Sequence, residues 1–364
     1  MKDPIIIVGA GLSGLRAASL LIEKGMECIV LESRQRIGGR VLSSDVDGPD
    51  FGKVDLGPTW FWPEHEPTIT YLVEELGLQT FVQHTEGAIL FEQSKNEPVQ
   101  RHMLPKGAIQ RSVRLIGGAQ ALIDALSETL PEGTVELNAC VTAIRMDEEG
   151  KVIVEAEQAG GRKKIIRAGA VILALPPRIV ERRIEFSPSL PDEIVKSLLD
   201  KPTWMAGQAK AVAIYERPFW RENGLSGQVT SWAGPLQEIH DASPHTDYGA
   251  LFGFFGIPAN MRQELGEEKI LELVIEQLTR LFGADADQPL SLIYKDWSID
   301  SHTAVEEDAA PLTSFPAYGP PVITGTWEKK LIFAGTETSP EHGGHLEGAL
   351  RSAERAVMEV MELK

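Results

Sequence analysis

Residues 5–14 read IIIVGAGLSG, four apolar residues followed by the glycine spacing G-x-G-x-x-G. A continuous apolar run of this length is typical of a strand buried on both faces of a parallel sheet. Apolar residues then recur at helical spacing up to Gly25, and residues 28–31 supply a second apolar run. The sequence therefore predicts a β-α-β unit with a glycine-rich turn between its first strand and its helix.

The glycine turn predicts an anion site. Without side chains at Gly9, Gly11 and Gly14, a pyrophosphate could approach the helix N-terminus closely, and Ser13 lies in the same turn. Glu32 ends the second strand 18 residues after Gly14, near the roughly 20 expected for a carboxylate that accepts hydrogen bonds from ribose hydroxyls. These residues predict a dinucleotide site and leave NAD and FAD open.

Composition limits the classes of partner. The chain has 364 residues, 43% of them hydrophobic, which is enough for a sizeable core and for two domains. Its 35 Lys and Arg residues against 53 Asp and Glu residues give a net charge of −18. Because such a surface repels phosphate backbones and anionic headgroups, we expect neither nucleic acid nor an anionic membrane as a partner.

Location is read from apolar runs and cysteines. No apolar run approaches the roughly 20 residues that span a bilayer, and the N-terminal residues lack the pattern of a secretory signal. Cys28 and Cys140 both lie in apolar runs, so a disulfide framework is not expected. We therefore expect a protein of the reducing cytoplasm.

The segment after Glu32 separates the two dinucleotides. Residues 33–40, SRQRIGGR, resemble the flavin-containing amine oxidase family, which includes monoamine and polyamine oxidases. In that family an R-x-G-G-R segment helps bind the FAD diphosphate. The resemblance implies that Arg34, Gly38, Gly39 and Arg40 contact FAD, and a guanidinium pairs well with phosphate oxygens.

A second match lies near the C-terminus. Residues 331–338, LIFAGTET, and 343–349, GGHLEGA, resemble the closing motif of the same family. There a strand ends at an acid that reaches ribitol hydroxyls, and a helix N-terminus faces the flavin ring. An NAD dehydrogenase has no need of this distant half. The contacts implied by the resemblance are those of Gly335, Glu337, Gly344, His345 and Leu346.

Smaller matches lie between the two motifs. Residues 55–60, DLGPTW, resemble the family's segment beside the flavin and imply contacts for Thr59 and Trp60. By the same resemblance Val141 contacts the adenosine half, and Trp297 lies near the ring. Neither cysteine matches the position where some relatives bond flavin covalently, so non-covalent FAD is expected.

Lys210 is the candidate catalytic residue. Residues 209–215, AKAVAIY, predict an apolar strand in which Lys210 shares a face with Val212 and Ile214. A desolvated ammonium is driven toward its neutral form, which marks such a lysine as functional unless it is merely solvated at a strand end. The family has a lysine here that holds a water against flavin N5.

The substrate side departs from the family. Many relatives place two aromatic rings before the flavin, whereas this chain has His345 at the second position and the run Glu306-Glu307-Asp308 around the first. The candidates for lining the substrate space are Trp62, His345 and Glu307, although a charge run is more often a solvated face. A helical block of the family is largely missing between residues 77 and 117. His302 and His342 show no metal-ligand spacing, so no metal is expected.

Together these features predict an α/β GR2-type flavoprotein, in which a Rossmann-like FAD-binding domain carries an inserted α+β substrate domain. The predicted FAD-binding ranges are 1–76, 113–196 and 326–364, and the substrate ranges are 77–112 and 197–325. The predicted activity is that of an FAD-dependent oxidoreductase that oxidises a small-molecule amine by hydride transfer to flavin N5, with dioxygen as acceptor. A desaturase or dehydrogenase of an apolar substrate and a non-catalytic FAD-binding protein remain alternatives. The sequence leaves the substrate and the oligomeric state open.

Overall fold

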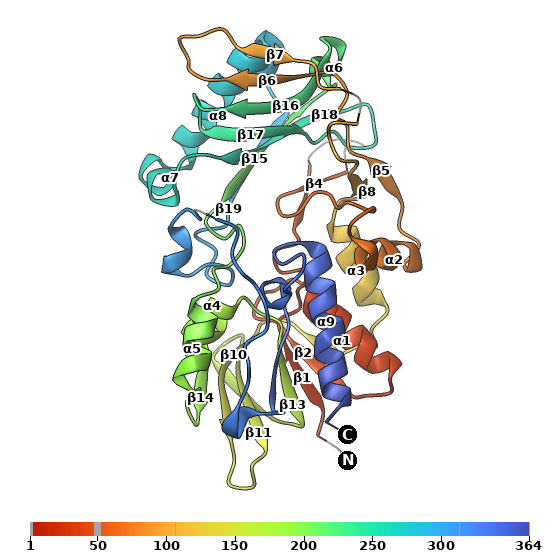
Figure 1. Ribbon diagram of the computed structural model, residues 1–364, viewed down its shortest axis with the longest axis vertical. Coiled ribbons are helices and arrows are strands. Elements are labelled where there is room, and N and C mark those ends of the chain that lie inside the picture. Colours follow the sequence, from red (N-terminus) through yellow and green to blue (C-terminus); the bar gives the residue numbers. More distant parts are fainter. Residues whose placement is uncertain (1–2, 47–51, 106, 313, 364) are drawn as a thin grey trace.

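The computed structural model describes residues 3–46, 52–105, 107–312 and 314–363 (Figure 1). Residues 1–2, 47–51, 106, 313 and 364, which the predicted domain ranges include, lie outside the described residues. One end of the molecule is built on a parallel sheet and the other on a largely antiparallel sheet, and both chain termini lie at the parallel end (Figure 1).

A five-stranded sheet forms the first half. Its strands, in spatial order, are β20 (Leu331–Phe333), β13 (Ala170–Leu173), β1 (Ile5–Val8), β2 (Cys28–Leu31) and β9 (Val135–Glu136). Every neighbouring pair is parallel. In β1, Ile5 and Ile7 enter one core while Ile6 and Val8 enter another, so the apolar run is buried on both faces, as its sequence predicts.

Helices and a second sheet cover the two faces of this sheet. The core that contains Ile5 and Ile7 is shared with residues of α1 (Leu12–Glu23), α2 (Pro67–Glu75), α3 (Gln120–Glu128) and α9 (Leu346–Met361). The core that contains Ile6 and Val8 includes residues of α4 (Pro177–Arg183), α5 (Asp192–Leu199) and a sheet of β12 (Arg162–Ala168), β11 (Val152–Gln158), β10 (Ala139–Met146) and β14 (Glu185–Ser187). The predicted Rossmann-like fold is thereby confirmed.

A seven-stranded sheet dominates the other half. Its order is β19 (Ser291–Asp296), β15 (Ala209–Tyr215), β18 (Gly249–Phe255), β17 (Leu236–Asp241), β16 (Leu225–Ser231), β6 (Ala88–Glu92) and β7 (Gln100–His102). One face of β15 packs in a core with α8 (Glu267–Phe282). The opposite face, with Val212 and Ile214, packs on Val54 and Leu56 near β3 (Ser43–Asp45) and β4 (Lys53–Asp55). Lys210 belongs to this second face, which turns toward the nucleotide-binding half.

The stretch around residues 77–117, where the sequence shows little apolar periodicity, contains four short strands. Strands β6 and β7 extend the edge of the seven-stranded sheet, whereas β5 (Thr80–Val82) pairs with β8 (Val113–Leu115). The β5–β8 pair crosses the predicted domain boundary at residue 112, and the division into domains remains a proposal. The remaining short helices are α6 (Phe219–Glu222), α7 (Ala259–Leu265), η1 (Ala284–Ala286), η2 (Glu306–Ala309), η3 (Gly325–Trp327) and η4 (Thr336–Thr338).

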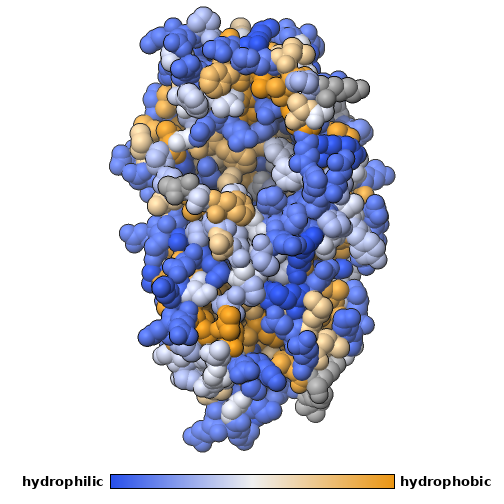
Figure 2. Space-filling view, in the orientation of Figure 1, coloured by the Kyte–Doolittle hydropathy of each residue, from blue (hydrophilic) through white to orange (hydrophobic). Residues whose placement is uncertain are grey.

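The surface is mainly hydrophilic, with small apolar patches between charged and polar side chains, as Figure 2 shows for one face. This agrees with the net charge of −18. Among the described residues, every helix is too short or too polar to cross a membrane.

Candidate functional site

One cavity, with a volume of about 370 Å³, brings most of the predicted site residues together. Its walls come from the β1–α1 turn, the end of β2, the segment after β4, strands β15 and β18, and the loop before α9. The predicted residues that line it are Gly9, Gly11, Ser13, Glu32, Arg34, Gly38, Gly39, Arg40, Thr59, Trp60, Trp62, Lys210, Trp297, Gly335, Gly344, His345 and Leu346.

The glycine turn leaves room at the start of α1. Gly9 has a φ of +102°, and an added Cβ would lie 2.8 Å from the Ala174 carbonyl oxygen. At Gly14 an added Cβ would lie 1.9 Å from the Gly9 oxygen, so this glycine lets α1 pack on β1 and does not itself line the cavity. Gly11 has no atom within 4 Å of an added Cβ. The first residues of α1 have no side-chain cap, so their N–H groups are available to an anion.

Glu32 is fixed at the end of β2. It is only 3% exposed, and its carboxylate accepts hydrogen bonds from the backbone N–H of Ala10 at 2.8 Å and of Arg34 at 2.9 Å. Because a carboxylate has about four acceptor positions, it can still receive hydroxyl donors from the cavity. This is the geometry expected of a ribose-binding acid.

The two predicted arginines are held by acids. Arg34 donates to Asp300 at 2.6 Å, and Arg40 donates both of its terminal nitrogens to Glu337, at 2.6 and 2.8 Å. Burial, the largest single influence, lowers the pKa of Arg40, but the charge and hydrogen bond of Glu337, together with the nearby Tyr318 and Asp308, make the net shift of this pKa upward. Glu337 is fully buried, accepts a further hydrogen bond of 3.1 Å from the Trp204 backbone N–H, and does not line the cavity. Its predicted contact with FAD stays a prediction.

The first and last motifs meet at one point. The Ser13 hydroxyl accepts a hydrogen bond of 3.0 Å from the backbone N–H of Gly335, and an isolated bridge joins Gly11 to Gly38. Residues that are more than 300 positions apart in the sequence therefore form one wall. On another wall, the Trp297 indole donates to the Leu56 carbonyl at 3.0 Å.

Lys210 is buried in the cavity wall, with 2% of its surface exposed. Its ammonium donates to the Thr59 hydroxyl at 2.6 Å and to the Gly57 carbonyl at 3.1 Å, and it lies 3.9 Å from the centre of the Phe252 ring. Burial lowers the pKa of Lys210 from 10.5 to about 7, while the charge of Asp55 partly opposes the shift. The side chain is therefore a mixture of amine and ammonium near neutral pH.

Aromatic rings line the cavity around Lys210. Trp60 lies 5.5 Å from Phe252 and 6.4 Å from Trp62 between ring centres, and Trp62 lies 5.6 Å from His345. Phe252 and Phe254, which the sequence analysis did not single out, alternate along β18 and thus share a face. Their strand pairs with β15, and the apolar run GALFGFF at residues 249–255, with two rings two positions apart, is the signal that could have identified them.

Glu66 is a second residue that sequence reasoning missed. It is 2% exposed, lines the cavity and lies immediately before α2. Its carboxylate accepts hydrogen bonds from the Trp62 backbone N–H and from His345 Nδ1, both at 2.8 Å. No sequence spacing connects Glu66 to His345, because only the packing of α2 against α9 brings them together.

Two further predicted residues lie away from the cavity wall. Val141 is buried in β10 within the core beneath the five-stranded sheet. Glu307 is exposed and pairs with Arg182, and its neighbour Asp308 is buried against Arg178 at 2.6 Å. The expectation that Glu307 lines the substrate space is therefore not supported: this acidic run is used by arginines of α4.

The cavity fits a flavin dinucleotide chemically. A side chain at Gly9 would have no space, so the turn stays open. The start of α1 offers N–H donors, and two backbone N–H groups align the carboxylate of Glu32. These are the parts that a pyrophosphate and a ribose require. Fold and cavity together place the protein in the class of dinucleotide-binding oxidoreductases.

Comparison with known proteins narrows this class. The profile of the flavin-containing amine oxidoreductase family matches residues 12–111 and 102–361. The chain belongs to this family and is a flavin-dependent oxidoreductase. The two matches meet at residues 102–111, inside the region where a helical block of the family was expected to be missing.

Individual proteins that resemble the chain are amine oxidases too. The chain is 26% identical to putrescine oxidase from Kocuria rosea over 479 aligned positions, which cover 99% of this chain and 95% of that one. Among solved structures, putrescine oxidase bound to putrescine has a TM-score of 0.81 at 23% identity, covering 100% of this chain and 99% of that one. Cyclohexylamine oxidase from Brevibacterium oxydans has a TM-score of 0.81 at 19% identity, with both chains fully covered. These structural likenesses show the fold.

Proposed function

We propose that the protein oxidises small amines with non-covalently bound FAD and dioxygen. The observation that carries this proposal is the single cavity into which Glu32, Lys210 and the aromatic rings all face. Bound flavin would supply the acceptor for a hydride from the carbon beside the amine nitrogen. Overall, the reaction would consume a primary amine, dioxygen and water, and would release an aldehyde, ammonia and hydrogen peroxide.

The cysteines support non-covalent binding. Neither Cys28 nor Cys140 lines the cavity. Burial raises the pKa of Cys28 to about 11 and also raises the pKa of Cys140, so both thiols stay protonated at neutral pH. A buried thiol of this kind is a poor nucleophile.

Lys210 would hold and move a proton in the cavity wall. Thr59 and Gly57 fix its nitrogen, and a pKa of about 7 lets it donate as an ammonium or accept as an amine near neutrality. A water beside this nitrogen would be oriented by it. The role proposed for Lys210 is therefore to position water and a proton at the reacting end of the cavity.

An amine fits the remaining walls better than a wholly apolar substrate. Trp60, Trp62 and Phe252 supply apolar area, and the buried Glu66 carboxylate supplies the negative charge that an ammonium seeks. An apolar isoprenoid or polycyclic substrate would remove water from that carboxylate and add no partner to the Trp62 N–H and His345 Nδ1 that it already has, which is unfavourable. The proteins of similar fold include oxidases whose names specify putrescine and cyclohexylamine.

Anaerobic mixing tests the proposal. The flavin-loaded protein is mixed with a panel of primary amines and, separately, with apolar isoprenoid and polycyclic compounds, while flavin absorbance is followed. We expect amines to bleach the flavin, and we expect air to restore its colour with release of peroxide. Reduction by the apolar compounds alone would favour a desaturase, and a flavin that no compound reduces would favour a binding protein.

A further inference from the structure

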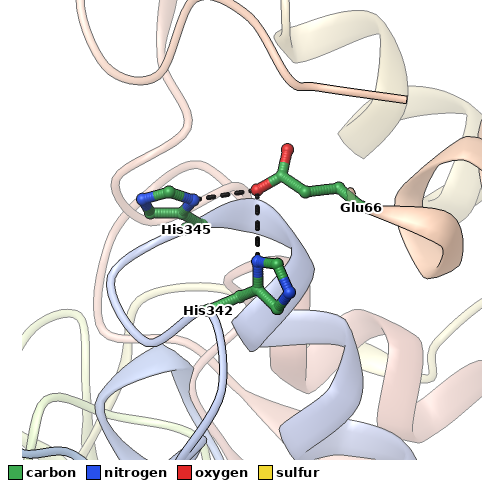
Figure 3. A group of neighbouring side chains, drawn as sticks. All are labelled: Glu66, His342 and His345. Carbon is green, nitrogen blue, oxygen red and sulfur yellow. Dashed lines mark hydrogen bonds and ion pairs between the residues drawn. The ribbon is translucent and has the colours of Figure 1, made fainter. Parts of the chain in front are cut away.

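Three side chains from two segments of the chain converge beside the cavity. Glu66 precedes α2, His345 precedes α9, and His342 lies in the loop before it. The ligand atoms of these three residues all lie within 4.8 Å of one another. Figure 3 shows both imidazole rings directing Nδ1 toward the same Glu66 oxygen, at 2.8 Å from His345 and 3.9 Å from His342.

These distances suit a small divalent ion. Zinc–nitrogen and zinc–oxygen bonds of about 2.0–2.1 Å in a tetrahedron separate neighbouring ligand atoms by about 3.3–3.4 Å. The 2.8 Å and 3.9 Å separations lie on either side of this value, and the two histidine nitrogens lie within 4.8 Å of each other. Side-chain rotations, with loss of the proton that His345 Nδ1 shares with Glu66, would bring all three atoms around one ion. Two imidazoles and one carboxylate are a ligand set that borderline transition ions prefer.

Burial and backbone geometry support a built site. Glu66 is held from behind by the Trp62 backbone N–H, which fixes its second oxygen. The histidine side chains are 26% and 35% exposed, so an ion could reach them from solvent. His342 has a φ of +54°, a left-handed conformation that is uncommon outside glycine and that points to a functional constraint.

We propose that Glu66, His342 and His345 bind one divalent transition-metal ion of the zinc type, with an open coordination position toward the cavity. The proposed ion site does not depend on which substrate the cavity takes, because the ligand atoms of its three side chains already lie within 4.8 Å of one another. Glu66 and His345 also line the cavity, so a bound ion would occupy part of the amine space. Zinc should therefore inhibit amine oxidation reversibly.

Calorimetric titration tests the site without relying on turnover. Zinc chloride is added to the flavin-loaded protein in a buffer that does not bind zinc, and we expect one ion per chain. His342→Asn removes the imidazole but keeps a residue that tolerates the left-handed backbone. This variant should weaken zinc binding by at least about 100-fold, because even the outer partners of metal ligands are worth about 10- to 100-fold.

Matched variants complete the test. Glu66→Gln should weaken binding similarly, whereas His102→Ala, at an exposed histidine of β7, should leave it unchanged. Each variant must retain the wild-type flavin spectrum and melting temperature. If Glu66→Gln does not fold, the test rests on His342→Asn. Anomalous diffraction from a zinc-soaked crystal should place the ion among the three side chains. The absence of stoichiometric binding, or binding that His342→Asn leaves intact, would overturn the proposal, whatever substrate the enzyme oxidises.

Discussion

The burial of Lys210 destabilises the folded protein and also gives this residue its proposed catalytic use. Transfer of an ammonium from water into an apolar sheet is unfavourable, and here the Thr59 hydroxyl, the Gly57 carbonyl and the Phe252 ring offset only part of that loss. The remaining penalty appears as the fall in its pKa to about 7. A structural role alone would be served as well by methionine, which fills a similar volume.

Lys210→Met should therefore separate chemistry from folding. Because Met keeps the apolar stem and deletes the charge, we expect flavin content to persist while flavin reduction or reoxidation slows by about 10²- to 10⁴-fold. Stopped-flow traces of both half-reactions at equal flavin occupancy give the measurement, with Lys269→Met on the exposed face of α8 as control. If both rates stay within about threefold of wild type, under about 1 kcal/mol of barrier, Lys210 has no catalytic role.

The same substitution has a predicted pH signature. Because the folded-state pKa of Lys210 is about 7 and its ordinary value is 10.5, the unfolded state binds more protons between these limits. The free energy of unfolding of the wild type should rise with pH across this window, and the residue contributes no pH dependence below about pH 7. Lys210→Met has no such pH dependence. The free energy of unfolding of this variant should therefore exceed that of the wild type most near about pH 6, and the difference should shrink toward about pH 10. Denaturant unfolding of both proteins across this range measures the difference, and a pH-independent difference would contradict the buried, shifted lysine.

Glu32 is the side chain whose removal we expect to weaken retention of the cofactor. Glu32→Ala removes the acceptor proposed for the ribose hydroxyls and also leaves the N–H groups of Ala10 and Arg34 without this partner. At about 1.5–3 kcal/mol for a hydrogen bond to a charged group, FAD should dissociate at least about tenfold more readily. Flavin occupancy after dialysis provides the comparison, with the exposed Glu27→Ala as control. Equal occupancy in all three proteins would show that Glu32 does not contact the cofactor.

At the scale of elements, the sequence predicted best where burial is regular. The runs at 5–8, 28–31 and 209–215 coincide with β1, β2 and β15. Strand β7 is exposed at all three residues and β5 at two of three, so neither could leave an apolar pattern. These strands form because β8 and β6 offer them backbone hydrogen-bond partners. The pattern of apolar residues along the sequence carries no information about such partners.

The contact between α1 and β1 yields a prediction for a pair of glycines. Gly14→Ala would place a Cβ 1.9 Å from the Gly9 oxygen, so α1 must shift, at about 1–3 kcal/mol. Gly11→Ala meets no atom within 4 Å and instead projects into the proposed pyrophosphate space. We therefore expect Gly14→Ala to lower the melting temperature of flavin-free protein, and Gly11→Ala to keep that temperature while losing flavin. Thermal unfolding and flavin absorbance distinguish the two, and equal melting temperatures would contradict the packing role of Gly14.

At the scale of the whole molecule, the site joins segments that sequence patterns could list but not assemble. Glycine spacing and family resemblance identified nearly half of the residues that line the cavity in advance. They could not indicate that Glu337 turns to Arg40, that Glu307 faces Arg182, or that Glu66 meets His345. Those outcomes depend on which charges lie opposite one another after packing, a long-range property that one-dimensional spacing does not contain.

The mode of flavin binding is testable on the intact protein. Because Cys28 and Cys140 lie outside the cavity and burial raises the pKa of both thiols, no cysteine should link the cofactor. Acid precipitation should release all yellow colour into the supernatant, where mass spectrometry should identify FAD. Colour that stays in the pellet would reveal a covalent link, and released FMN would exclude the dinucleotide.

The closing motif completes the cavity: β20 pairs with β13, and the loop that follows brings Gly335 and Leu346 to its wall. A growing polypeptide that ends before residue 331 has the β13 edge open and one wall unbuilt. We therefore expect cofactor capture to follow synthesis of residues 331–346, long after the glycine turn has been made. In a cell starved of riboflavin we expect colourless protein whose activity returns on refeeding without new translation.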